Sequence, residues 1–175
     1  MVENEGNEQD KGSFLDVPPF QGEQELAGAL EQCIIYACEQ GAHTLCFCDG
    51  DFAAWPLSNE RVIDALTQWA RSPSNQRRLT VIAATYLTLE REHGVWKRWL
   101  RTWGHRVSCL EVNSEFDAEV PCVFLSDNVM LSVRNKDTCA GYVTQEKADL
   151  VPMRLRLNEL EKNSSPAFSV TTLGL

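Results

Sequence analysis

Apolar positions in the first two thirds of the chain follow two alternating spacings. Three short, apolar-rich runs predict buried strands, and these runs are His43–Cys48, Leu79–Ala84 and His105–Val112. Three longer segments place apolar residues three or four positions apart, as one face of a helix does, and these segments are Gln24–Ala37, Ser58–Ala70 and Tyr86–Trp103. Gly41 and Gly104 are expected to stop the first and third helices, and Ser58 to cap the second. This alternation predicts right-handed crossovers onto a parallel sheet.

The pattern changes after the third predicted strand. Two short apolar runs, Cys122–Leu125 and Val129–Val133, are separated by the turn-forming residues 126–128, which predicts a hairpin. Thr138–Val143 is interpreted as one more strand. Because hairpin strands run antiparallel, the sheet is expected to be mixed, although mainly parallel.

The chain is expected to form one domain between two tails. Residues 1–22 are polar and acidic, which predicts a disordered acidic tail. Residues 23–162 are predicted to form a single α/β domain, with a mixed, mainly parallel sheet flanked by helices in three layers. Within it, Gln145–Glu161 fits no single spacing, and its charge and length favour a helix that starts at Pro152 or is kinked there. Residues 163–175 are predicted to be a C-terminal tail.

Composition narrows the class of protein further. Hydrophobic residues make up 43% and charged residues 23% of the chain, as in a globular domain. There is no apolar run of about 18 residues, and the N-terminus lacks the basic and apolar parts of a signal peptide. We therefore expect a cytoplasmic protein with no membrane partner. The seven cysteines are expected to be reduced and mostly buried, without a metal, because Cys46 and Cys48 have no second ligand pair.

The charge is unevenly distributed along the chain. A net charge of −9 argues against a protein that binds nucleic acid through bulk charge. Half of the 16 basic residues nevertheless lie between residues 71 and 106, interleaved with tryptophans at helical spacing. That spacing places the rings on one face, interpreted as core, and the cations on the other. A partner that is anionic, nucleic acid included, is expected to contact four of these cations, which are Arg77, Arg78, Arg98 and Arg101.

Two carboxylates follow the first predicted strand, at the place where ligands of open parallel sheets gather. The segment Asp49-Gly50-Asp51 is interpreted first as a turn. An apolar strand that ends in Asp-x-Asp also resembles the first motif of haloacid-dehalogenase-type phosphatases. That resemblance implies Asp49 as nucleophile, Asp51 as general acid and magnesium as cofactor, with Thr85 in the second motif and Asp127 in the last acidic motif. The sequence departs from that family because the expected lysine and the second acid of the last motif are missing.

Three stretches together resemble a small uncharacterised bacterial family, and they are Phe47–Leu57, Trp96–Val107 and Thr172–Leu175. In that family an acidic turn of the form Asp-x-Asp-Phe-x-x-Trp-Pro-Leu follows the first strand. The matching residues here are Asp49, Asp51, Phe52, Trp55, Pro56 and Leu57. The family resembles a single half of the phospholipase D-like fold, which implies a mixed sheet flanked by helices and a hairpin region over Val123–Tyr142.

Active phospholipase D relatives carry His-x-Lys-x4-Asp in this region, where the histidine attacks phosphorus and the lysine holds the phosphate oxygens. The chain has no His-x-Lys, and Ser126 and Asn128 stand near those positions. Its three histidines also lack the spacing of a catalytic triad. The sequence therefore predicts a non-catalytic binding or interaction module, with an unknown protein or an anionic ligand as partner and a homodimer as its assembly. The alternative is the magnesium-dependent phosphatase.

Overall fold

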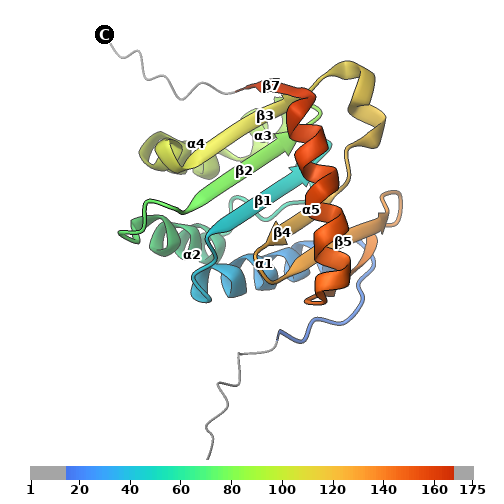
Figure 1. The fold of residues 1–175 in the computed structure, drawn as a ribbon, viewed down its shortest axis with the longest axis horizontal. Helices are drawn as coiled ribbons and strands as arrows, with labels where there is room; N and C mark the ends of the chain where they lie inside the picture. Colours follow the sequence, from blue (N-terminus) through green and yellow to red (C-terminus); the bar gives the residue numbers. More distant parts are fainter. Residues whose placement is uncertain (1–14, 168–175) are drawn as a thin grey trace, which may run out of the picture.

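The computed structural model describes residues 15–167, apart from the side chains of residues 118 and 119, and arranges them in three layers (Figure 1). The middle layer is a seven-stranded sheet in the order β6-β5-β4-β1-β2-β3-β7. The strands are β1 (Thr44–Asp49), β2 (Arg78–Ala83), β3 (Val107–Val112), β4 (Val123–Ser126), β5 (Met130–Asn135), β6 (Ala140–Thr144) and β7 (Ser164–Pro166). The helices are α1 (Glu23–Glu39), α2 (Glu60–Arg71), α3 (Leu87–Glu92), α4 (Gly94–Trp103) and α5 (Lys147–Lys162), with 3-10 segments at Gly104–Arg106 and Ser114–Glu119.

The two faces of the sheet are covered unequally. In Figure 1, α5 crosses the front face and the other helices lie behind the sheet. Side chains of β1 alternate between the faces: Leu45 and Phe47 belong to the larger core with α1, α2 and α4, whereas Cys46 and Cys48 pack on the α5 side. The α/β class and the mixed sheet predicted from the sequence are confirmed.

The prediction of a mainly parallel sheet is wrong. Among the described strands, β1–β2 and β2–β3 run parallel, whereas β1–β4, β4–β5, β5–β6 and β3–β7 run antiparallel. The length of the connections explains two of these antiparallel pairs, β4–β5 and β5–β6. Turns of a few residues join β4, β5 and β6, and a parallel pairing needs a crossover of a dozen residues or more.

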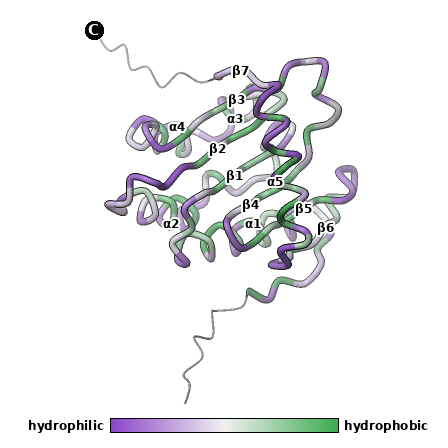
Figure 2. The backbone as a smooth tube through the Cα atoms, viewed as in Figure 1, coloured by the Kyte–Doolittle hydropathy of each residue, from purple (hydrophilic) through white to green (hydrophobic). Residues whose placement is uncertain are grey.

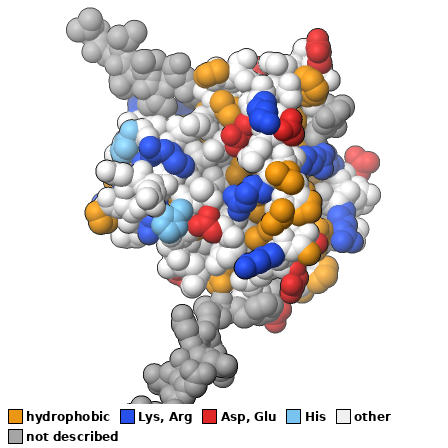
Figure 3. All heavy atoms as spheres, in the orientation of Figure 1, with side chains coloured by type: hydrophobic (Ala, Val, Ile, Leu, Met, Phe, Trp, Pro, Cys, Tyr) orange, Lys and Arg blue, Asp and Glu red, His pale blue; other side chains and the backbone are white. Residues whose placement is uncertain are grey.

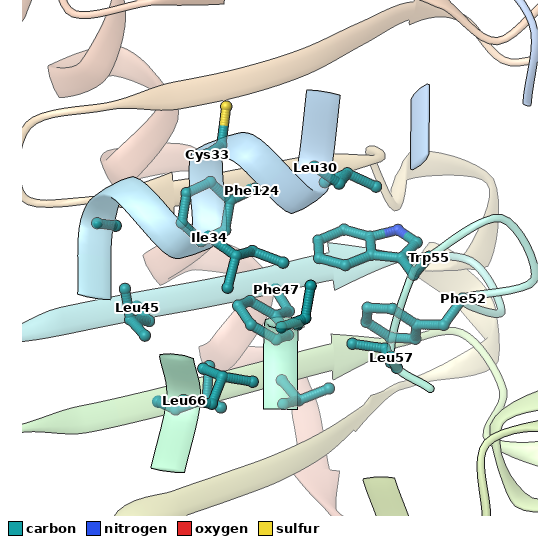
Figure 4. Close-up of a cluster of buried hydrophobic side chains, with 14 of the residues drawn as sticks. Leu30, Cys33, Ile34, Leu45, Phe47, Phe52, Trp55, Leu57, Leu66 and Phe124 are labelled. Carbon is teal, nitrogen blue, oxygen red and sulfur yellow. The ribbon is translucent and has the colours of Figure 1, made fainter. Parts of the chain in front are cut away.

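Phe47 lies at the centre of the larger core (Figure 4). Its ring centroid is 5.2 Å from that of Trp55, 5.8 Å from Phe124 and 5.9 Å from Trp96. Trp96 in turn stacks on Trp99 at 5.0 Å, and both are buried. The interpretation of these helix tryptophans as core is therefore confirmed. Figure 2 shows the matching contrast along the chain, in which a hydrophilic connection after α2 leads into hydrophobic β2.

Gly41 ends α1 as predicted. Its φ of 69° lies in the left-handed region, which a residue with a Cβ adopts at a cost. The N–H of Gly41 donates to the carbonyl of Cys38 at 3.1 Å, and the N–H of Ala42 donates to that of Ala37 at 3.0 Å. These two bonds form a Schellman motif, which satisfies carbonyls left free at the helix end.

The cap of α2 differs from the prediction by one residue. Asn59, and not Ser58, precedes the helix, and its side-chain oxygen accepts the backbone N–H of Arg61 at 2.9 Å and of Val62 at 3.4 Å. Asparagine and serine both suit this position, so the sequence alone did not separate the two neighbours.

The third predicted helix is two helices, because α3 ends before His93 and α4 begins at Gly94. The His93 ring is buried, with Nδ1 3.3 Å from the Ser58 hydroxyl and Nε2 3.1 Å from the Phe52 carbonyl. A glycine next to it lowers the local helix propensity, and the buried ring fixes the break. Helix α4 ends before Gly104, as predicted.

Both predicted tails contribute to the fold within the described residues. Phe20 is 6% exposed and exchanges two backbone hydrogen bonds with Gly141 of β6, at 3.1 and 3.0 Å. At the opposite edge, β7 pairs with β3. The ordered domain therefore extends beyond the predicted boundaries at residues 22 and 163, because unpaired sheet edges offer hydrogen bonds to the flanking chain. The rest of the predicted tails, residues 1–14 and 168–175, lies outside the described residues.

The helix predicted for this segment is confirmed, but it begins at Lys147 with Pro152 inside it, so the alternative of a start at Pro152 is wrong. Proline lacks the N–H that would bond back along the helix, and this lost bond is accommodated inside α5. The helix is anchored on the sheet by Leu150, Leu157 and Leu160. Within residues 15–167, no helix has the length and apolar character needed to cross a membrane.

Candidate functional site

A pocket of about 240 Å³ opens at the carboxyl end of β1, between the following turn, the start of α1 and the β5–β6 hairpin. We call it the β1 pocket. Ligands of open α/β sheets gather at such strand ends. Part of its wall is apolar, and its chemically active lining residues are Glu23, Asp49, Asp51, Cys122, Lys136 and Cys139.

The predicted turn after β1 holds its two carboxylates at the rim of the pocket. The backbone N–H of Phe52 donates to Asp49 Oδ2 at 2.9 Å, and that of Ala53 donates to Asp51 Oδ1 at 3.0 Å. Phe52 has a φ of 63°, which is strained for a bulky side chain. Its ring is fully buried and lies 5.0 Å from Trp55 (Figure 4). The aromatic residues of the motif therefore anchor the turn in the core, and the acids face the pocket.

Burial dominates the electrostatics of the β1 pocket. Desolvation raises the pKa of Asp49, and the nearby Asp51 charge raises it further. Backbone N–H groups of Gly50 and Phe52, and the Cys122 thiol, act in the opposite direction without cancelling the rise. Burial, followed by the charge of Asp49, also raises the pKa of Cys122. Asp49 therefore carries its charge at a cost to the fold, which is common for groups retained for function.

Lys136 and Cys122 also line this pocket, although neither was predicted from the sequence. Lys136 lies in the β5–β6 turn, and its ammonium group donates to the Val120 carbonyl. Cys139, in the same turn, has a φ of 50°, a second non-glycine residue in the left-handed region. The sequence predicted strands on both sides of the β5–β6 turn. The position of this turn beside Asp49 depends on the antiparallel pairing of β4 with β1 and of β5 with β4.

The phosphatase resemblance assigned Asp127 to the last acidic motif, and the structure does not bring Asp127 to Asp49. Strands β1 and β4 are antiparallel, with Cys48 opposite Val123 and Leu45 opposite Ser126, so Asp127 lies at the amino end of β1. The described residues contain no group of three His, Cys, Asp or Glu side chains arranged to hold a metal ion. The residues present do not fit magnesium, and no catalytic step through it is derived.

Asp127 instead ties the β4–β5 turn to the start of β1. Its carboxylate accepts the backbone N–H of His43 at 2.6 Å and of Thr44 at 3.2 Å, as well as the Thr44 hydroxyl. Burial raises its pKa, but these hydrogen bonds outweigh burial and leave the pKa lowered. The side chain is 38% exposed, so solvent screens part of the effect.

Asp127→Ala is expected to lower the free energy of unfolding by about 1 kcal/mol at neutral pH, as loss of a cap does. Because the folded pKa is lowered, the stabilisation is present above the unfolded value of 3.8 and is lost as pH falls through the folded pKa. Urea denaturation at pH 7 and pH 3 measures both effects. Equal stability of the variant and the parent at pH 7 would contradict this role.

The four arginines predicted to bind an anion do not converge on one site. Arg77 donates to the Trp69 carbonyl at 2.8 Å and lines a groove beside α1 and α2. Arg78 lines a cleft on the α5 side of the sheet. Arg98 and Arg101 are exposed on α4. Arg77 precedes β2 and Arg78 is its first residue, and their side chains lie on different surfaces.

None of the three histidines lines the β1 pocket. His43 is exposed at the start of β1, with Nδ1 3.6 Å from Asp127. His93 is buried at the α3–α4 break, and the ring of His105 lies 6.0 Å from that of Trp103 beyond α4. Both were expected to open strands, but His43 directly precedes β1 and His105 lies in the 3-10 segment before β3.

Comparison with known proteins informs the fold alone. A scan of family models and a search of curated proteins both found no match. Among solved structures, the chain is similar to TrmBL2, described as an archaeal chromatin protein that shows a novel mode of DNA binding. The TM-score is 0.58 at 12% sequence identity, and the likeness covers 85% of this chain but 54% of TrmBL2. This chain therefore spans about half of that neighbour, and the two share an α/β architecture.

Proposed function

We propose that this chain is a non-catalytic binding module of the phospholipase D-like class, and that the β1 pocket takes a small ligand with a cationic group. The observation that carries the proposal is the lining of that pocket. Three carboxylates, those of Glu23, Asp49 and Asp51, meet one ammonium group there. The ammonium of Lys136 is already bonded to a backbone carbonyl. The surplus of negative charge in a partly desolvated pocket favours a cation.

The distribution of the histidines supports a binding role over phosphodiester hydrolysis. A phosphohistidine route needs an imidazole and an ammonium group on one phosphate. Lys136 lies in the β1 pocket, whereas His43 lies at the other end of β1. The expected assay result is no turnover of bis-p-nitrophenyl phosphate by the pure protein. Turnover would contradict the non-catalytic part of the proposal.

Nucleic acid is a less favoured partner for this chain. TrmBL2 binds DNA by its description, but the net charge here is −9 and the predicted arginines are divided among three surfaces. Affinity for DNA rests largely on clustered phosphate contacts. Titration of the protein with an oligonucleotide at low salt is expected to show no saturable binding. Light scattering of the protein alone tests the predicted homodimer.

Binding in the β1 pocket can be tested by calorimetry with ethanolamine, putrescine and spermidine. We expect at least one of these amines to bind, and Asp49→Asn to weaken its binding at least tenfold. The matched control is Asp64→Asn, which removes the same charge from an exposed site on α2. Equal affinity in the two variants, or no binding of any amine to the parent protein, would overturn the pocket assignment.

Asp49→Asn is also expected to raise the free energy of unfolding, by about 0.5–2 kcal/mol at pH 7, as substitutions that relieve a functional site do. The raised pKa of Asp49 gives stability that is present below the unfolded value of 3.8 and is lost as pH rises through the folded pKa. The gain from asparagine should therefore shrink as pH approaches 3.8. Thermal unfolding of the variant and the parent between pH 7 and pH 3.8 measures this gain in stability. A variant less stable than the parent at pH 7 would contradict the prediction.

A further inference from the structure

A second cleft, of about 140 Å³, lies between α5 and the amino-terminal halves of β1 and β2. It is at the opposite end of β1 from the β1 pocket, on the face of the sheet away from the larger core. Arg78 reaches it from β2 and Arg154 from α5. Figure 3 views the face that α5 crosses and shows basic side chains over and beside this helix. We call it the α5 cleft.

The guanidinium of Arg154 is held in place and still has free donors. One terminal nitrogen donates to the Ser126 carbonyl at 2.8 Å, and the other lies 3.5 Å from the Thr44 hydroxyl. Arg78 donates to the Arg77 carbonyl at 3.2 Å. A guanidinium carries five N–H donors, so each arginine keeps several that can reach a ligand.

Neither arginine is neutralised by an acid among the described residues. The ion pairs of residues 15–167 join other side chains. Glu161 also lines the α5 cleft, but burial raises its pKa and no ion pair with Arg78 or Arg154 forms. Asp127 is engaged by the backbone of His43 and by Thr44. Two guanidinium groups in a narrow cleft repel each other, and an anion between them removes that cost.

We propose that the α5 cleft binds a single phosphate group between Arg78 and Arg154. Guanidinium forks match phosphate oxygens, and two forks from different elements suit a tetrahedral dianion better than one planar carboxylate. Thr80 and Asn158 add a hydroxyl and an amide to the lining. At about 140 Å³ the cleft is large enough to take one phosphate group. The remainder of a phosphate monoester would lie outside.

The test is a ¹H–¹⁵N NMR titration of the full chain, with inorganic phosphate and with phenyl phosphate as probes. We expect saturable shifts at the amides around Thr80 and Asn158. Arg78→Gln should raise the dissociation constant at least tenfold, because it removes one fork from an exposed side chain without disturbing the core. The matched control is Arg98→Gln, which removes the same charge from α4 and should leave the affinity unchanged.

The two probes distinguish free phosphate from a phosphate ester. Binding of phenyl phosphate at least as tight as that of inorganic phosphate assigns the α5 cleft to a monoester, and tighter binding of inorganic phosphate assigns it to the free ion. Arg154→Lys keeps the charge but loses the fork, and is expected to weaken both probes. No saturable shift in the parent protein, or equal loss in Arg78→Gln and Arg98→Gln, would overturn the proposal. The β1 pocket is untouched by these variants, so the two binding assignments fail independently.

Discussion

Gly141→Ala is expected to lower the free energy of unfolding by about 3 kcal/mol. A Cβ at this position of β6 would lie 2.6 Å from Phe20 Cζ and 2.9 Å from Val133 Cα, and closer still to the Ser132 carbonyl oxygen. Two of these neighbours are backbone atoms of β5, which cannot rotate away as a side chain can. Overpacking at such a point displaces the buried Phe20 ring and separates two strands.

Urea denaturation measures this loss, and Gly28→Ala is its control. Gly28 lies inside α1, and a Cβ there would meet nothing within 4 Å. Alanine is a better helix former than glycine, so this variant should be more stable by about 0.5–1 kcal/mol. If Gly141→Ala proves as stable as the parent, neither β5 nor Phe20 lies as close to Gly141 as described.

Arg106→Ala is expected to lower the free energy of unfolding by about 2–3 kcal/mol. The Arg106 side chain is 8% exposed, and its two terminal nitrogens donate to the carbonyls of Ser74 at 2.7 Å and Ser72 at 2.9 Å. Bonds from a charged donor are worth more than neutral ones, and their loss leaves the α2–β2 connection without its anchor. Arginine 106 is thus part of the scaffold and not of an anion-binding surface.

Thermal unfolding and limited proteolysis of the α2–β2 connection together test this anchor. Arg98→Ala is the matched control, because Arg98 is exposed on α4 and should change stability by less than about 0.5 kcal/mol. Faster cleavage is expected in Arg106→Ala alone. Unchanged stability and cleavage in that variant would show that the two carbonyl bonds contribute little in solution.

Local patterns in the sequence predicted the elements, and long-range pairing decided what they could not. The spacing of apolar residues located β1, β2 and β3 and the helices between them, and Gly41 marked the end of α1. The sequence pattern did not show whether β4 runs parallel or antiparallel to β1. Because β4 returns antiparallel beside β1, Asp127 lies far from Asp49, and Lys136 is brought next to it.

The charged residues show the same limit. Eight basic residues close together in sequence look like one surface, but Arg106 is buried and Arg77 and Arg78 diverge. Arg154 lines the α5 cleft together with Arg78. It comes from the segment Gln145–Glu161, in which the spacing of apolar residues fitted neither a helix nor a strand alone. Proximity of two guanidinium groups from β2 and α5 is a property of packing, which no local pattern encodes.

The ends of the sheet constrain how copies of this protein can associate. One outer strand, β6, exchanges two backbone hydrogen bonds with Phe20 at Gly141, and Gly22 donates to the Thr138 carbonyl in the turn before β6. The other, β7, spans three residues and ends in a proline, which cannot donate to a neighbouring strand. Within the described residues, both features disfavour strand-by-strand growth into a continuous sheet across molecules. We therefore expect self-assembly to use a helical or side-chain surface, and fibre-like aggregation to be disfavoured.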